Sequence, residues 1–165
     1  METAGVISAA LGGKYLTFSL GSEEYGVGIM KVREIIGILE ITAVPHTPDF
    51  IKGVVNLRGR VIPVIELRLK FGMETQEYNE RTCIIVVEVQ GESTTLQVGV
   101  LVDSVSEVLN IADEEIEPPP DFGTVTEADN ILGMGKVKGQ VKILLDVDKV
   151  VGRGLMDALV SMARG

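Results

Sequence analysis

The residues best suited to nucleophilic chemistry are a single histidine and a single cysteine, His46 and Cys83. A cysteine–histidine dyad requires the imidazole to take the thiol proton within hydrogen-bond reach. His46, however, lies in a loop bounded by Pro45 and Pro48, and Cys83 lies in the apolar run 82–89, where a thiol usually behaves as a small core side chain. The sequence therefore predicts no catalytic dyad, and it offers no histidine–cysteine cluster for zinc.

Carboxylate pairs are the other candidates for acid–base chemistry, and they are common in this chain, as at 23–24 and 113–115. A general acid needs a carboxyl group whose pKa is raised by an apolar setting. These pairs lie in polar stretches typical of solvated turns. We therefore expect no catalytic residue, no cofactor-binding residue and no metal ligand. A carboxylate-dependent hydrolase that uses acidic groove residues stays open as the alternative to a non-catalytic protein.

A binding role is better supported at the segment N-L-R-G, residues 56–59. It lies between the apolar runs 51–55 and 61–67, a pattern typical of a β-hairpin tip whose glycine can take a positive φ. Arg58 at such a tip either holds a carboxylate through two parallel hydrogen bonds or is a solvated charge. Glu34, which interrupts an apolar stretch, either pairs with Arg58 or points to water.

The elements that would position these residues are short strands. Alternation with period two and β-branched apolar runs predict strands over residues 15–20, 25–29, 60–67, 82–89 and 95–102. Pro63 cannot donate to a ladder, so residues 60–67 are expected at an edge or a bulge. Strands at this spacing are typical of a β-barrel or sandwich. Aromatic residues make up 4% of the chain, so the core is expected to be aliphatic.

The two ends of the chain fall outside this pattern. Residues 1–13 are expected to form a flexible leader. Residues 153–165 are expected to form a C-terminal helix, because Leu155, Leu159 and Met162 recur at helical spacing. The apolar face of this helix either covers the protein's own core or docks a partner.

An internal repeat divides the rest of the chain. Residues of the region 26–38 recur 73 positions later, and residues of the region 53–72 recur 80 positions later, after an insertion near 123–130. We therefore expect two related β units, about 14–75 and 80–152, with possible strand exchange. Each unit is too small for a comfortable core of its own, so they should share one hydrophobic core within a single domain, residues 14–152.

Composition narrows the classes of partner. The chain has 165 residues with 24 acidic and 15 basic side chains, a formal charge of −9. This balance disfavours nucleic acid and anionic membranes, which need a basic surface. No window approaches 18 consecutive apolar residues, and the first 13 residues lack the positive start of a secretory signal. A cytoplasmic protein is expected.

The first half of the chain contains the motifs V-R-E-I-I at 32–36, P-D-F-I-K-G-V-V-N-L-R-G at 48–59, and I-P-V-I-E-L-R at 62–68. Together these motifs resemble the CheW family, the bacterial chemotaxis coupling proteins. The second half agrees through V-S-E-V-L at 105–109 and I-L-L-D at 143–146. The resemblance runs from about Lys14 to Val151, which is most of the chain.

The resemblance implies a mainly β fold, with two SH3-like five-stranded barrels around a shared core. It implies a non-catalytic adaptor that couples the histidine kinase CheA, through its regulatory domain, to the cytoplasmic tips of methyl-accepting chemotaxis receptors, on the inner face of the membrane. The adaptor would need no cofactor, nucleic acid or membrane insertion. The receptor-binding positions of the family fall on Val32, Glu34, Asn56, Leu57, Arg58 and Val61. A helical receptor tip is expected to lie in a groove between the barrels.

Overall fold

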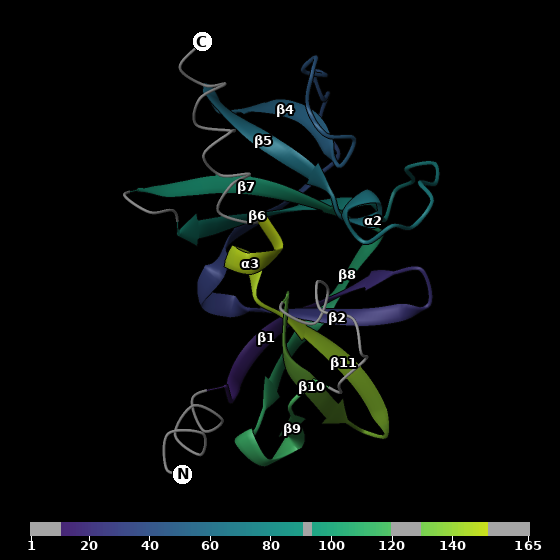
Figure 1. The fold of residues 1–165 in the computed structure, drawn as a ribbon, viewed down its shortest axis with the longest axis vertical. Helices are drawn as coiled ribbons and strands as arrows, with labels where there is room; N and C mark the ends of the chain where they lie inside the picture. Colours follow the sequence, from purple (N-terminus) through teal and green to yellow (C-terminus); the bar gives the residue numbers. More distant parts are fainter. Residues whose placement is uncertain (1–10, 91–93, 120–129, 152–165) are drawn as a thin grey trace.

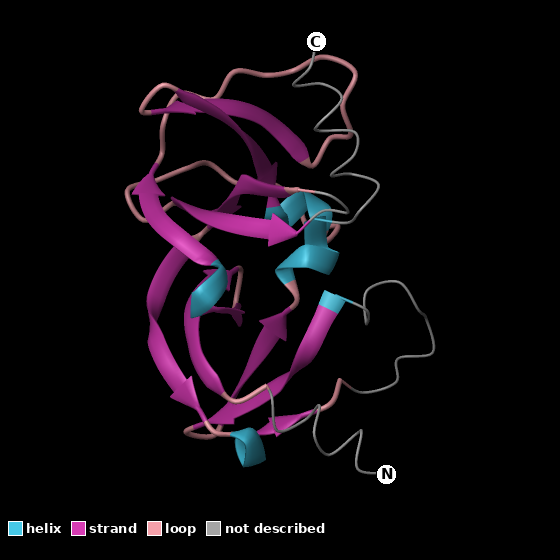
Figure 2. Cartoon of the chain, turned by 90° about the vertical axis from the view of Figure 1, so that its left-hand side faces the viewer, coloured by secondary structure: helices cyan, strands magenta, loops and turns pink. Residues whose placement is uncertain are grey.

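The computed structural model describes residues 11–90, 94–119 and 130–151, and strands dominate this part of the chain (Figures 1 and 2). The strands are β1 (Gly13–Leu20), β2 (Glu23–Gly28), β3 (Val32–Gly37), β4 (Ile51–Leu57), β5 (Arg60–Glu66), β6 (Cys83–Gln90), β7 (Thr95–Val102), β8 (Ser104–Ile111), β9 (Ile116–Glu117), β10 (Ile131–Val137) and β11 (Gln140–Leu145). The helical turns are η1 (Ile29–Lys31), α2 (Leu67–Lys70), η2 (Asp113–Glu115) and α3 (Val147–Val151). The predicted C-terminal helix and nearly all of the predicted leader lie outside the described residues.

The strands form two sheets, which confirms the predicted mainly β fold class. Sheet A has the order β8-β1-β2-β11-β10-β9, and sheet B has the order β3-β6-β7-β5-β4. Neighbouring strands are antiparallel except for two pairs, β2 with β11 and β5 with β7. Figure 1 shows β4 and β5 toward one end of the long axis and β9, β10 and β11 toward the other.

The two parallel contacts follow from the sequence repeat. In sheet A, Gly26 of β2 is paired with Leu144 of β11, and in sheet B, Gly99 of β7 is paired with Val64 of β5. Gly99 lies 73 positions after Gly26, and Leu144 lies 80 positions after Val64, so the two contacts are repeat equivalents. Each sheet therefore takes strands from both repeat units. The division at 14–75 and 80–152 stays a prediction about the sequence units.

Strand β5 lies between β7 and β4, so the expected edge is limited to the part of the strand up to Pro63, which has no ladder partner in β7. The pairing of β5 with β7 begins at Val64, the residue after Pro63. The missing N–H group of Pro63 therefore lies just before the parallel ladder begins. The expected irregularity lies close by, between Ile51 and Gly53 of β4.

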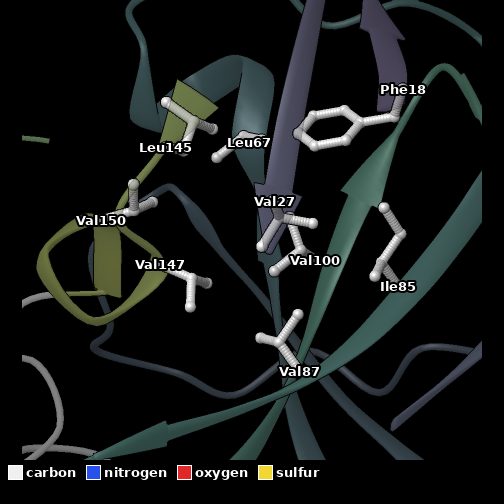
Figure 3. Close-up of a pocket in the computed structure, with 9 residues that line it drawn as sticks. All are labelled: Phe18, Val27, Leu67, Ile85, Val87, Val100, Leu145, Val147 and Val150. Atoms are coloured by element: carbon white, nitrogen blue, oxygen red, sulfur yellow. The ribbon is translucent and has the colours of Figure 1, made fainter. Parts of the chain in front are cut away.

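The largest core cluster lies between the sheets and is aliphatic apart from Phe18, as expected. Figure 3 shows residues of this cluster around a small internal cavity. Sheet A provides Phe18, Val27 and Leu145, sheet B provides Ile85, Val87 and Val100, and α3 adds Val147 and Val150. Burying one such aliphatic side chain stabilises a fold by about 1.5–3 kcal/mol, so this shared cluster holds the two sheets together as one body. A second cluster lies on the other face of sheet B and includes Val55, Leu57, Ile62 and Val86.

Candidate partner-binding site

The tip of the β4–β5 hairpin presents Arg58 in a left-handed backbone conformation. Arg58 has φ 52° and Gly59 has φ 86°. Two successive residues with positive φ are the signature of a type I′ turn, whose twist matches that of the flanking strands. The Asn56 Oδ1 atom accepts a hydrogen bond from the Gly59 N–H at 2.8 Å, which closes the turn. The turn thus fixes the backbone from which the Arg58 side chain projects.

Arg58 forms an ion pair with Glu34, so the pairing that the sequence left open is present. A bulge in the β3–β6 ladder between Val32 and Glu34 sets the direction of the glutamate. The Arg58 side chain remains 69% exposed and that of Glu34 31% exposed. The hydrogen bond and charge of Glu34 raise the pKa of the Arg58 guanidinium. The pair therefore orients a charged group that a partner can still reach.

Two further polar contacts link neighbouring strands of sheet B. Arg33 of β3 forms an ion pair with Glu88 of β6, and Arg60 Nη2 of β5 donates to Gln97 Oε1 of β7 at 2.6 Å. Glu88 and Gln97 are directly opposite each other in the β6–β7 ladder. We call this set the mouth ring: Arg33, Glu34, Arg58, Arg60, Glu88 and Gln97. Its members belong to β3, β6, β7, β5 and the hairpin tip.

The other predicted residues occupy different environments. Leu57 is buried, with 7% exposure, in the core cluster of sheet B, so it supports the hairpin from inside and offers little surface. Val61 is 66% exposed on β5. Val32 is half-buried and packs against the core between the sheets. The six predicted residues thus lie on β3 and on the β4–β5 hairpin, where the Glu34–Arg58 contact links the two elements.

An exposed apolar strip lies on η1 and β3. Met30 of η1 is 87% exposed and Ile35 of β3 is 43% exposed, with Val32 between them in the chain. Val32 and Ile35 are paired with Val87 and Ile85 of β6, whose side chains face the core between the sheets. The strip therefore lies along the edge of the seam between the sheets.

The expected groove between the barrels is largely filled by the shared core. An open cavity of about 240 Å³ lies elsewhere on sheet A, lined by Tyr25, Phe71, Met73 and neighbouring residues. None of the six predicted receptor-binding residues lines this cavity. The predicted receptor-binding site therefore consists of the mouth ring and the apolar strip, and not of a groove.

The groups considered for catalysis are not assembled for it. His46 is exposed in its loop, and the Cys83 Sγ donates to the Arg81 carbonyl at 3.2 Å. The carboxyl groups of Asp103 and Glu24 have lowered pKa values, because Arg68 and Lys142 respectively donate hydrogen bonds to them. A lowered pKa is the opposite of what a general acid needs. No group of three histidine, cysteine or acidic side chains suited to a metal occurs in the described ranges.

Comparisons with known proteins show the family to which the chain belongs. The family model for the CheW-like domain matches residues 14–154. The chain is 40% identical to the chemotaxis protein CheW of Klebsiella aerogenes, covering 93% of this chain and 90% of that one. It is 37% identical to the chemotaxis protein CheW of Rhizobium meliloti, covering 84% and 87%. The crystal structure of the scaffolding protein TtCheW from Thermoanaerobacter tengcongensis superposes with a TM-score of 0.75 at 35% identity, covering 85% and 92%. Within the described residues, no helix is long and apolar enough to cross a membrane.

Proposed function

Because this chain belongs to the CheW-like family, we propose that it couples the histidine kinase CheA to the cytoplasmic tips of methyl-accepting chemotaxis receptors. Proteins of the family are scaffolds in chemotaxis, and this chain is an adaptor rather than an enzyme. The proposal places it in the cytoplasm, at receptor arrays on the inner face of the membrane. The hydrolase alternative is dropped.

The receptor half of the proposal is supported by two features of β3: the ion pair of Glu34 with Arg58, and the exposed apolar strip. A helical hairpin offers a stripe of apolar side chains flanked by polar ones. The strip of Met30, Val32 and Ile35 suits the apolar stripe, and Arg58 is an exposed charge that is oriented by Glu34 of the same strand, β3. Apolar contacts would supply most of the affinity, while the rim charge would set register and association rate.

The hairpin of β10 and β11, at the other end of the molecule, offers a second surface (Figure 1). A shallow cleft of about 530 Å³ lies there, lined by Pro118, Pro119, Met134 and Val141, with the Lys136–Glu117 ion pair at its side. Val141 is 51% exposed and lies 80 positions after the exposed Val61. We assign the kinase regulatory domain to this surface, since an adaptor must leave one end free while the other is occupied.

The proposal is tested by size-exclusion chromatography of the protein with a CheA regulatory domain and a receptor cytoplasmic fragment from the same organism. A ternary complex that forms without nucleotide is expected. Arg58→Ala should weaken receptor capture at least threefold and leave kinase binding intact, whereas Val141→Asp should do the reverse. Arg81→Ala, which removes an exposed arginine before β6, is the matched control and should change neither.

Two outcomes would count against the proposal. Absence of a complex with either partner would contradict the proposed adaptor role. Unchanged receptor capture by Arg58→Ala, in a variant that unfolds like the wild type, would move the receptor site away from the mouth ring.

A further inference from the structure

We propose that Arg60 recognises an acidic side chain of the receptor tip, beside Arg58, an inference that rests on the proposed function. The mouth ring holds three guanidinium groups. Arg33 and Arg58 each form an ion pair with a carboxylate, Glu88 and Glu34 respectively. Arg60 instead donates to the neutral amide of Gln97 at 2.6 Å, and within residues 11–90, 94–119 and 130–151 it forms no ion pair.

The amide of Gln97 orients Arg60 without neutralising it. A guanidinium group has five N–H donors in a rigid fork, and the bond to Gln97 Oε1 uses one donor of Nη2. The backbone of Arg60 is also fixed, because it is paired with Leu57 as the first residue of β5 after the tight turn. Arg60 is exposed, so the remaining donors face solvent or a partner. A carboxylate can therefore be bound with little loss of side-chain freedom.

Sheet A has a carboxylate at the position that corresponds to Gln97, and this carboxylate neutralises a cation of the protein itself. Glu24 lies 73 positions before Gln97, and its carboxylate takes the place of the amide. Glu24 Oε1 accepts a hydrogen bond from Lys142 Nζ at 2.7 Å, and the Lys142 side chain is only 8% exposed. In sheet A this carboxylate thus neutralises a lysine that corresponds to Ile62 of the first repeat unit. In sheet B the position of Glu24 carries an amide, so Arg60, whose own repeat equivalent is Gln140, keeps its charge available.

The net positive charge of the mouth ring makes Arg60 selective for acidic groups of a partner. Three guanidinium groups against two carboxylates give the mouth ring a formal charge of +1, in a chain whose formal charge is −9. A local positive region on an acidic protein favours approach of an acidic group to that region and disfavours its approach elsewhere. The partner chemistry that fits is a glutamate or aspartate on the polar flank of a receptor helix, next to the apolar stripe.

The test measures association rates by stopped flow between the full protein and a purified receptor cytoplasmic fragment, at low and at physiological salt. Arg60→Gln should slow association about threefold to tenfold at low salt and flatten its salt dependence. Arg81→Gln removes the same charge from an exposed position that precedes β6, and this variant should behave like the wild type. Replacing the acidic residues of the receptor tip with their amides should make the wild type and Arg60→Gln equal.

A second variant keeps every arginine in place. Gln97→Glu provides Arg60 with a carboxylate, so it should slow association as Arg60→Gln does, without lowering the unfolding midpoint. Equal rates for Arg60→Gln and Arg81→Gln, or a Gln97→Glu variant that binds like the wild type, would overturn the role of Arg60. If Arg58→Ala still weakened capture, the proposed function would stand. A wild-type protein that binds no receptor fragment would contradict both the role of Arg60 and the proposed function.

Discussion

Arg68 and Asp103 form a bidentate ion pair that connects the two sheets. Arg68 Nε lies 2.8 Å from Asp103 Oδ1, and Arg68 Nη2 lies 2.6 Å from Asp103 Oδ2. Arg68 belongs to α2, which follows sheet B, and Asp103 lies on the crossover from β7 to β8. Asp103 Oδ2 also accepts a hydrogen bond from the Gly21 N–H at 2.7 Å, in the β1–β2 turn of sheet A.

The repeat contains a second such connection with the charges exchanged. Asp148 of α3 lies 80 positions after Arg68, and it pairs with Lys31 of η1 at 3.0 Å, on the crossover from β2 to β3. Asp148 Oδ1 accepts a hydrogen bond from the Gln90 N–H at 2.8 Å, at the end of β6. Each carboxylate thus binds one backbone N–H at a hairpin and one cation, but the acid is on the crossover in one case and on the helix in the other.

Asp103→Asn should destabilise the protein by about 2 kcal/mol, because it leaves the Arg68 side chain, 10% exposed, without its counter-charge. Asp148→Asn should cost less, under about 1 kcal/mol, since the Lys31 and Asp148 side chains are 38% and 34% exposed. Urea unfolding followed by circular dichroism gives both values. Equal losses for the two variants would mean that exposure does not decide the strength of these pairs.

The same pair predicts the direction of the pH dependence. The hydrogen bond from Arg68, aided by that from Gly21, holds the pKa of Asp103 below its usual range. A carboxyl group with a lowered folded-state pKa stabilises the fold fully above the unfolded-state value of about 4, and this contribution is lost as the pH falls from there through the folded-state value. The difference in unfolding free energy between the wild type and Asp103→Asn should therefore be largest near pH 7. A difference that persists unchanged at pH 3 would contradict this assignment.

Exchanging the charges of Arg58 and Glu34 separates folding from binding. Arg58→Glu alone places two carboxylates together and should lower the unfolding free energy. Adding Glu34→Arg restores an ion pair and should restore stability, while receptor capture stays weak because the cation has moved from the tip to β3. Thermal unfolding and receptor pull-down on the four proteins of this cycle provide the measurement. Full recovery of capture by the double variant would show that the position of the cation is irrelevant.

Gly53 should not tolerate a side chain. Its φ is 148°, and a Cβ atom there would lie 2.1 Å from the Thr42 carbonyl oxygen, which accepts the Val54 N–H at 2.9 Å. Gly53→Ala should therefore cost about 3 kcal/mol or more in a urea titration. Gly37→Ala is the matched control, because a Cβ atom there meets nothing within 4 Å. Similar losses for both variants would argue against the close approach of Thr42.

The sequence predicted much of this fold because its signals are local. Period-two alternation predicted β1, β-branched apolar runs predicted β6 and β7, all nearly to their ends, and glycine at a hairpin tip predicted the turn that presents Arg58. The exchange of strands left no such local signal beyond the repeat itself. A parallel contact such as that of β2 with β11 depends on residues more than 100 positions apart, and the alternation of each strand is the same whichever partner it has.

The contacts of the mouth ring could likewise be predicted from the sequence only in part. Glu34 and Arg58 could be suggested as a pair because each interrupts an apolar pattern. Arg33 could not be joined to Glu88, because the bulge between Val32 and Glu34 breaks the alternation that decides which face a side chain takes. Arg60 and Gln97 meet only because β5 lies beside β7. The repeat offers one retrospective signal, since Gln97 corresponds to the ion-paired Glu24.

The exchange of strands between repeat units has a consequence for biosynthesis. When β1 to β5 have left the ribosome, β2 still lacks β11 and β5 still lacks β7, so both strands expose unsatisfied hydrogen-bonding edges. Sheet B becomes complete only after β7 is translated, and sheet A only after β11, close to the end of the described chain. Final closure of the molecule is therefore a late event, and a nascent chain stalled midway would be a substrate for chaperones.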